Sequence, residues 1–367
     1  MTSRAERIAA EARALGFPRI GCAPLVPLPV GRFLDGWLAD GRAGEMRYLA
    51  ERTAERLDPR LAMPWARAVV SLAWPYRPAP PPPEDWRAAL RGRIAAYALG
   101  ADYHDRLAEV LRALAARLAA AFPGARFRHY VDTGPVLERE WAMRAGVGWI
   151  GKNTLVLDRA LGSYFFLAEL FTDLELDAVP LATDHCGGCT RCHAACPTGA
   201  LGPGYTMDPR RCIAYLTIEH RTAIPLDLRA ELGNWIFGCD VCQDACPWNR
   251  DAGDPAASDA LAPHLPSLLA LDAAGFRARF GRTAVSRAKR RGLLRNVAVA
   301  LGNTGNRDAV PALAAALDDP EPLVRGHAGW ALGRLGGAAA RHALEAARPR
   351  ETDPDAAAEM DAARASF

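Results

Sequence analysis

The sequence predicts an α+β protein in three parts: an N-terminal α/β domain over residues 1–175, a short cysteine-rich domain over 176–250, and an all-α domain over 268–367. Three observations support this division. Helical patterns alternate with β-like runs in the first part, eight of the nine cysteines lie between positions 186 and 246, and the last part is alanine-rich with helical periodicity. A chain of 367 residues, half of them hydrophobic, is long enough to bury two or three cores.

The N-terminal part opens with a short amphipathic helical pattern that lacks the apolar centre of a secretory signal. A longer amphipathic helix is predicted over 106–122, and β-like runs occupy 66–76, 126–136 and 153–158. The proline-rich segment 78–85 is expected to be a surface connection. Because no apolar run reaches about 18 residues, we expect no transmembrane helix. The lack of a secretory signal leads us to expect a cytoplasmic protein. In that reducing compartment, clustered cysteines are more often metal ligands than disulfides.

The cysteines form two sets. The first has the spacing C-x2-C-x2-C-x3-C-P, by which bacterial ferredoxins bind 4Fe–4S clusters and in which the fourth cysteine ligates the other cluster of the pair. The second set also ends in Cys-Pro but contains a helix-bearing insertion of 26 residues. We therefore predict a ferredoxin-like domain with two 4Fe–4S clusters and crossed ligands: Cys186, Cys189, Cys192 and Cys246 for the first cluster, and Cys196, Cys212, Cys239 and Cys242 for the second.

Zinc is the alternative for this region, with His185 and His193 as further ligands, but two Cys-Pro endings fit cluster sites better. Cys22 lies far upstream and is expected to be an ordinary buried thiol. Two adjacent clusters form a path for single electrons, and the rest of the chain must contain what those electrons reach.

The C-terminal part repeats itself. ALGNTG at 300–305 recurs as ALGRLG at 331–336, and each copy follows an apolar helical pattern. This is typical of paired-helix repeats of the HEAT type. A linker over 251–267 precedes the repeats, and eight basic residues occur between 277 and 295 with no acidic residue from 273 to 307. Although the net charge is only +3, this stripe is suited to phosphates; otherwise it is a solvated face opposite acidic neighbours.

Polar residues with possible chemistry gather at three places in the N-terminal part. Tyr97, Asp102, Tyr103 and His104 crowd the start of the long helix, and they could equally be half-buried structural residues. Asp132 precedes Thr-Gly-Pro, a turn that could hold its carboxylate at a cleft as a general acid or simply use it to cap backbone amides. The third place is the glycine-rich stretch 146–156, which fits no Walker pattern and contains Lys152 and Asn153.

Taken together in order, these motifs resemble the epoxyqueuosine reductase family. The resemblance covers DYH at 102–104, VDTGP at 131–135, AGVGWIGKNTLV at 145–156, GSYFFLAEL at 162–170 and both cysteine sets. It continues through RCIAYLTIEHR at 211–221, GCDVCQDACPWN at 238–249 and the C-terminal repeats. The chain departs from the family pattern at Leu99 and Ala214, which puts small contacts in doubt but not the chemistry.

The resemblance implies an enzyme that reduces epoxyqueuosine to queuosine at the wobble position of a tRNA anticodon. It implies base-off cobalamin in the N-terminal domain, reduced through the two clusters, and Asp132 as the proton donor. It implies a monomer and a separate low-potential electron donor. By position, the residues expected to line the corrin are Arg56, Tyr97, Asp132, Lys152, Asn153 and Ser163. The residues expected to contact tRNA are Arg287, Lys289, Arg290, Arg291 and Arg295.

Two other functions are compatible with parts of the sequence. A reductive dehalogenase of small molecules would use the same cofactors, but such enzymes usually have a twin-arginine signal, which is not present here, and no reason for a basic repeat tail. A non-enzymatic ferredoxin-type electron carrier with a docking module would bind clusters but neither corrin nor tRNA.

Overall fold

The computed structural model describes residues 3–76, 85–250 and 262–367. It contains two compact units. Unit 1 comprises residues 1–78, 102–209 and 241–254, and unit 2 comprises 79–101, 210–240 and 255–367. This division runs through the predicted cysteine-rich domain, so the predicted boundaries at 175 and 250 do not coincide with it. Most of the predicted proline-rich connection and of the linker lies outside the described residues.

Unit 1 is built on a four-stranded sheet in the order β1-β2-β7-β4, in which every neighbouring pair is antiparallel. Its strands are β1 (Arg19–Pro24), β2 (Ala68–Pro75), β7 (Phe165–Thr172) and β4 (Phe127–Tyr130). The β-like runs predicted at 66–76 and 126–136 thus contain β2 and β4, and the run at 153–158 contains the short strand β6 (Val156–Leu157), which pairs with β5 (Trp149–Ile150). The α+β class is confirmed: the strands of this sheet pair antiparallel, with non-consecutive strands as neighbours, and they do not form parallel βαβ units.

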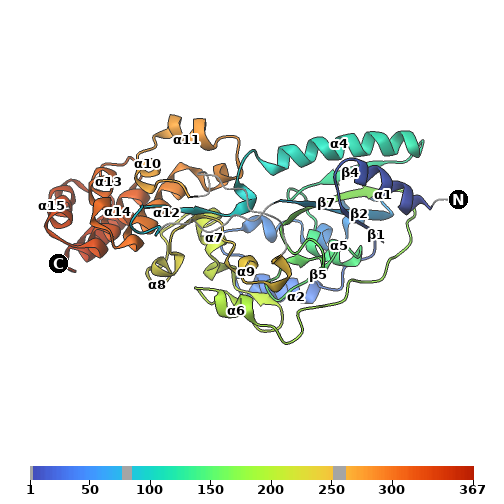
Figure 1. Ribbon diagram of the computed structural model, residues 1–367, viewed down its shortest axis with the longest axis horizontal. Helices are drawn as coiled ribbons and strands as arrows, with labels where there is room; N and C mark the ends of the chain where they lie inside the picture. Colours follow the sequence, from blue (N-terminus) through green and yellow to red (C-terminus); the bar gives the residue numbers. More distant parts are fainter. Residues whose placement is uncertain (1–2, 77–84, 251–261) are drawn as a thin grey trace. The chain divides into compact units, whose positions relative to one another are not determined.

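Both faces of this sheet are covered, because most residues of β2 and β7 are buried at successive positions and therefore on both sides of each strand. Helices α1 (Arg4–Ala14) and α4 (Tyr103–Ala121) pack on one face, and Figure 1 shows α4 as the long helix beside α1. Leu107, Leu111, Leu114 and Leu118 recur along α4 at helical spacing and are at most 1% exposed. The second face is covered by α5 (Glu138–Arg144) through Trp141.

The remaining helices of unit 1 are short. They are α2 (Gly31–Ala39), α3 (Thr53–Leu57), α6 (Arg191–Ala195) and α9 (Val241–Asp244). A two-stranded ribbon of β8 (Leu201–Gly202) and β9 (Thr206–Met207) follows the first cysteine set.

Unit 2 contains the C-terminal helices, drawn in orange and red in Figure 1. They are α10 (Leu265–Leu269), α11 (Ala273–Phe280), α12 (Lys289–Thr304), α13 (Val310–Ala316), α14 (Pro322–Leu335), α15 (Ala338–Ala347) and α16 (Pro354–Arg364). The repeated motifs end α12 and α14. Gly305 and Gly336 follow directly with φ near +66° and +65°, a conformation in which glycine ends a helix without the steric cost of a side chain.

The insertion between the second-set cysteines also belongs to unit 2. It forms α7 (Ile213–Ile218), α8 (Leu226–Arg229) and β10 (Trp235–Phe237), which pairs in parallel with β3 (Arg93–Ile94). Buried polar side chains attach it to the repeats. Arg229 is 1% exposed and forms a two-pronged ion pair with Glu359 on α16, while the Asn303 amide donates to the Arg229 and Gly233 carbonyls.

Arg295 on α12 makes the most extensive of these attachments. It is fully buried, and its guanidinium donates to the backbone carbonyls of Leu216, His220 and Thr222 at 2.6–2.8 Å. The carbonyls at and after the end of α7 have no partner within that short helix, so the arginine supplies the missing donors. Arg295 therefore fastens the insertion to the repeats.

Replacing Arg295 with methionine should destabilise unit 2. Methionine has a similar length but no donors, and each buried carbonyl left unpaired costs about 1–3 kcal/mol. We expect a total loss of about 3 kcal/mol or more, seen as a lower urea midpoint under anaerobic conditions and faster amide exchange in α7. The matched control is Arg291→Met on the same helix, because Arg291 is exposed. Equal midpoints for the two variants would contradict this structural role.

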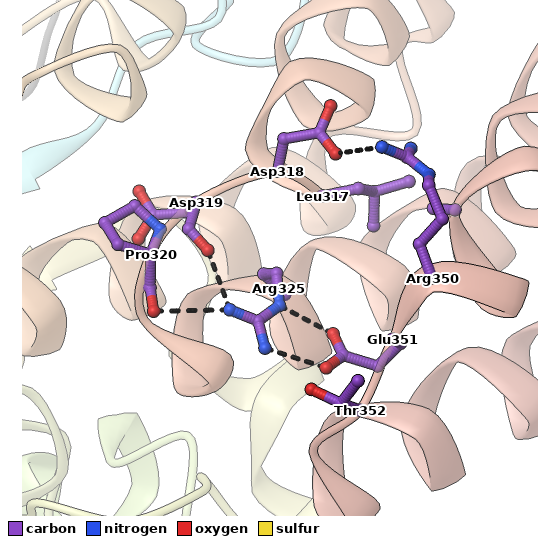
Figure 2. Close-up of a pocket in the computed structure, with 9 residues that line it drawn as sticks. Leu317, Asp318, Asp319, Pro320, Arg325, Arg350, Glu351 and Thr352 are labelled. Atoms are coloured by element: carbon purple, nitrogen blue, oxygen red, sulfur yellow. Dashed lines mark hydrogen bonds and ion pairs between the residues drawn. The ribbon is translucent and has the colours of Figure 1, made fainter.

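A surface hollow between the repeat helices, shown in Figure 2, is held by ion pairs. Arg325 contacts the Glu351 carboxylate through two hydrogen bonds of 2.6 and 2.7 Å and donates to the carbonyls of Asp319 and Pro320. Across the hollow, Arg350 pairs with Asp318 at 2.9 Å. Both guanidinium groups therefore form ion pairs with acids of the repeats, and the residues around the hollow stabilise the packing of the repeat helices.

Within the described residues, no helix has the length and apolar character needed to cross a membrane.

Candidate active site and cluster-binding loops

Asp132 stands on a turn immediately after strand β4. Its backbone has φ +50°, in the left-handed region that non-glycine residues rarely occupy, and its side chain is 67% exposed. The carboxylate therefore faces outward from the sheet edge and does not cap neighbouring amides.

Two residues from the start of α4 meet this carboxylate. The Tyr103 hydroxyl donates to Asp132 Oδ2 at 3.0 Å, and His104 Nε2 lies 3.9 Å from the same oxygen. His104 is oriented through its other ring nitrogen, which lies 2.7 Å from Asp102 Oδ1. The Tyr103 ring stacks on Phe166 of β7, with ring centroids 4.3 Å apart. The predicted polar groups at 102–104 and 132 are therefore brought together.

Beneath the Asp132 turn lie two acids that sequence analysis missed. Glu138, the first residue of α5, accepts the Asp132 backbone N–H through Oε1 at 2.6 Å. Glu169 is fully buried in the centre of β7, on the face covered by α5, where it accepts from the Ser71 hydroxyl and its carboxyl group interacts with that of Glu138. An acid inside the otherwise apolar run FFLAELF, residues 165–171, was the available sign of this pair.

Both acids have shifted pKa values. Loss of water around the carboxyl group, reinforced by the charge of Asp132, raises the pKa of Glu138 to about 8. Burial, reinforced by the charge of Glu138, raises the pKa of Glu169 well above its usual range. Because Glu169 is buried and Glu138 is half-buried, charging both carboxyl groups at once would place two repelling charges side by side, which favours a proton on the pair.

Of the other predicted corrin-lining residues, Arg56 lies at the same turn. It donates to the Gly134 carbonyl at 3.5 Å and to the Tyr48 carbonyl at 2.9 Å, so it contacts the segment that follows Asp132. Burial lowers the pKa of Arg56, while the charges of Tyr48 and Asp132 act in the opposite direction.

The other three predicted corrin-lining residues of unit 1 differ in their contacts; they are Lys152, Asn153 and Ser163. Lys152 Nζ donates to the carbonyls of Gly187 and Cys189 at 2.6 and 3.0 Å, so it holds the loop of the first cysteine set. The Ser163 hydroxyl is buried and donates to Gln243. Asn153 is 4% exposed, and its Nδ2 has no partner among the described residues.

Tyr97 belongs to unit 2, where it is part of a short 3₁₀ turn and its ring centroid lies 6.2 Å from that of Phe237.

The four cysteines predicted for the first cluster all lie in unit 1 and approach one another. Burial raises the pKa of the Cys246 thiol, and the charges of Cys186, Cys192 and Cys189 raise it further, which places Cys246 beside the first set. Gly151 lies against this loop: a side chain there would meet Leu157 Cδ1 at 2.2 Å and Cys186 Sγ at 3.4 Å. Four cysteines converging from two loops fit the crossed ligation predicted for the first cluster. No group of His, Cys, Asp or Glu in the described part of the chain is arranged around a single metal ion.

The second predicted set is divided between the units. Cys196 and Cys242 are in unit 1, whereas Cys212 and Cys239 are in unit 2, flanking the insertion. The ligand assignment for the second cluster stays a prediction.

Fewer side chains of the basic stripe, residues 277–295, are free to contact phosphates than the sequence indicated. Arg295 is buried, so its prediction as a nucleic-acid contact is corrected: its donors are used on backbone carbonyls. Arg290 pairs with Asp319 and its side chain is 16% exposed, and Arg287 pairs with Glu219. Lys289 and Arg291 are exposed. The acids that neutralise the stripe come from outside residues 273–307, where the sequence pattern could not show them.

Comparison with known proteins identifies the family. A curated epoxyqueuosine reductase of Xanthomonas campestris is 43% identical over 345 residues, covering 91% of this chain and 97% of its own length. The chain belongs to the epoxyqueuosine reductase family. The enzyme of Pseudomonas aeruginosa with the same name is 42% identical and covers 88% of this chain and 92% of its own.

Three family models match parts of the chain. The model for epoxyqueuosine reductase QueG matches residues 56–133, the 4Fe–4S double cluster binding domain matches 185–249, and HEAT repeats match 284–363. The double-cluster and repeat predictions are therefore confirmed. Membership of this oxidoreductase family also decides against the dehalogenase and electron-carrier alternatives.

Solved structures agree over the full length. One epoxyqueuosine reductase, solved with an epoxyqueuosine-modified tRNA-Tyr stem loop, has a TM-score of 0.91 at 30% identity and covers 98% of both chains. The enzyme from Bacillus subtilis, solved with its catalytic aspartate loop swung out of the active site, has a TM-score of 0.90 at 30% identity and covers 99% of this chain and 98% of its own.

Proposed function

We propose that this protein reduces epoxyqueuosine in a tRNA anticodon to queuosine, with Asp132 as the proton donor and cobalamin and two 4Fe–4S clusters as cofactors. The observation that carries this proposal is the Asp132 turn. An outward carboxylate, held by Tyr103 and supported from below by Glu138, stands in the same unit as the first cysteine set. Family membership over nine-tenths of the chain supplies the substrate class.

The reaction consumes two electrons and two protons. Both carbon–oxygen bonds of the epoxide break, a carbon–carbon double bond forms, and the oxygen leaves as water. In this scheme Asp132 gives a proton to the epoxide oxygen as the first carbon–oxygen bond opens, which stabilises the leaving charge. Tyr103 and His104 hold the Asp132 carboxylate in position, and His104 is oriented by Asp102.

The residues around the site are compatible with a corrin. Asn153 offers a buried amide N–H without a partner among the described residues, which suits the amide-rich rim of that cofactor. Bound cobalamin would supply a strongly reducing cobalt centre, and electrons would reach it through the clusters. Lys152 would act by fixing the loop of the first cysteine set, and Ser163 by fixing the loop that contains Cys242 and Cys246, since that is where their hydrogen bonds go.

The direct test is turnover by the full chain, purified anaerobically with both clusters and supplied with cobalamin and a low-potential reductant. We expect queuosine to appear in epoxyqueuosine-containing tRNA by nucleoside mass spectrometry, and the cobalamin absorption spectrum to change on binding. A fully loaded protein that leaves the modified tRNA unchanged would contradict the proposed function.

The tRNA would be attracted by the exposed part of the basic stripe. A structure of a relative with a modified stem loop supports a tRNA substrate, and acting on one base of the loop requires that base to be turned out of its stack. Lys289 and Arg291 are the members of the predicted set best placed for phosphate contacts, since both are exposed, whereas Arg290 is fixed by its ion pair.

The double variant Lys289→Gln/Arg291→Gln should bind tRNA more weakly and with less dependence on salt. Removing two phosphate contacts should reduce the slope of log affinity against log salt by about 1.5. Fluorescence binding titrations at several salt concentrations measure this slope. The control is Arg341→Gln, an exposed arginine on α15 paired with Glu345. If the double variant and the control have the same slope, the stripe is not the tRNA site.

A further inference from the structure

Glu169 places a carboxyl group in the core, where an apolar side chain would pack at lower cost, and the half-buried Glu138 lies beside it. Glu169 occupies a strand position at 0% exposure whose neighbours on the same face, Leu167 and Phe171, are apolar. A carboxyl group at such a position costs several kcal/mol unless it is paired or protonated. Its presence therefore calls for a role in the adjacent site.

The polar contacts of Glu138 and Glu169 connect the core of the sheet with the backbone of Asp132. Ser71 on β2 lies directly opposite Glu169 in the sheet and donates to its Oε1 at 3.3 Å. The other oxygen, Oε2, receives no donor from the described protein groups. A proton on Glu169, shared with the Glu138 carboxyl, satisfies this buried oxygen and leaves Glu138 Oε1 free to accept the Asp132 N–H.

Asp132 needs such an anchor because of its backbone conformation. A non-glycine residue at φ +50° stores roughly 1–3 kcal/mol of strain and persists only where its surroundings hold it. A hydrogen bond to a charged acceptor contributes about 1.5–3 kcal/mol, enough to offset that strain. The anchor is short, at 2.6 Å, and comes from the first residue of a helix that packs against the sheet.

We propose that Glu138 and Glu169 share one proton and act as a latch, in which Glu138 fixes the backbone of Asp132 and Glu169 supports Glu138 from the core. Glu138 is a positioning residue, and Glu169 is its proton-carrying partner. The inference rests on the proposed function in one respect: it assumes that Asp132 is the proton donor whose placement matters.

The latch is also sensitive to pH. The charged groups that face it are Asp132 on the turn, Arg139 on α5 and the two acids themselves. When the shared proton is lost at alkaline pH, both carboxylates become charged, and their repulsion separates Glu138 from the position that accepts the Asp132 N–H. The turn should then loosen as pH rises through about 8.

Amide hydrogen exchange on the full, cluster-loaded chain tests the latch without relying on turnover. Glu138→Ala should speed exchange of the segment 131–137 by about tenfold or more, after correction for the intrinsic rate, and lower kcat with little change in KM for tRNA. Glu138→Gln should stay close to the wild type, because its amide oxygen still accepts the Asp132 N–H and its NH₂ group can donate to Glu169. Glu140→Ala is the matched control on the same helix, since Glu140 pairs with Arg144.

The variant Glu169→Gln tests whether the shared proton, and not only the packing of Glu169, keeps the Asp132 turn in place. Glu169→Gln carries a permanent donor, so its segment 131–137 should keep the same corrected exchange rate from pH 6.5 to 9.5, whereas the wild type loosens above about pH 8. The latch is refuted if Glu138→Ala leaves exchange unchanged, if Glu138→Gln loosens the turn as much as Glu138→Ala, or if wild type and Glu169→Gln respond alike to pH. Failure of the proposed function would appear separately, as absent turnover by a wild type whose exchange pattern is as described.

Discussion

Asp132→Asn should lower queuosine formation by about 10²–10⁴-fold, because an amide cannot give a proton to the epoxide oxygen. The substitution is nearly isosteric, and the backbone N–H at this position would still reach Glu138, so the turn should keep its shape. The loss should therefore fall on kcat, with binding of tRNA and of cobalamin close to wild type. Single-turnover assays with the fully loaded protein measure the chemical step directly.

The control for this variant is Asp177→Asn, an exposed acid in the loop that follows β7. It should retain wild-type turnover. An Asp132→Asn enzyme with ordinary single-turnover rates would remove Asp132 as the donor, and Tyr103, whose hydroxyl contacts the same carboxylate, would be the next group to test.

The second large effect is expected for Cys246→Ala. Cys246 is the predicted ligand from the second loop to the first cluster and lies beside the first cysteine set, so alanine should remove one of the four predicted ligands of that cluster. We expect the iron content to fall from about eight to about four per chain, with loss of turnover, since the electron path is broken. Iron and sulfide analysis with electron paramagnetic resonance of the reduced protein measures both clusters.

Cys22→Ala is the matched control for cysteine loss. Cys22 lies 4% exposed in the core of unit 1, and burial raises the pKa of its thiol to about 11, which makes it an inert packing residue. This variant should keep about eight irons and lose only a little stability. If Cys246→Ala also retained its full iron content, the crossed ligation of the first cluster would be wrong.

Much of the architecture could be predicted from local patterns. The spacing of Leu107, Leu111, Leu114 and Leu118 defined the long helix because helical periodicity is a local property. The Cys-x2-Cys spacings identified the clusters because a short loop must wrap around each one. The recurrence of ALGNTG as ALGRLG indicated the paired-helix repeats because each copy lies at the end of a repeat helix.

The parts that could not be predicted depend on residues far apart in the chain. The 26-residue insertion appeared to belong with the cysteines that flank it, yet Arg229, Arg295 and Asn303 attach it to the repeats. The basic stripe appeared free because its acids, Glu219 and Asp319, are distant in sequence.

The sequence by itself therefore determined the family resemblance, the double-cluster cysteine spacing, the repeat helices and the placement of Asp132 on a turn. Only the tertiary structure decided what surrounds Asp132. Asp132 is contacted by Tyr103 from α4 and by Glu138 from α5. Glu169, in the centre of β7, supports Glu138. The physical reason is that motif spacing records constraints along the backbone, whereas hydrogen bonding and burial of a carboxylate depend on which distant segments the sheet brings beside it.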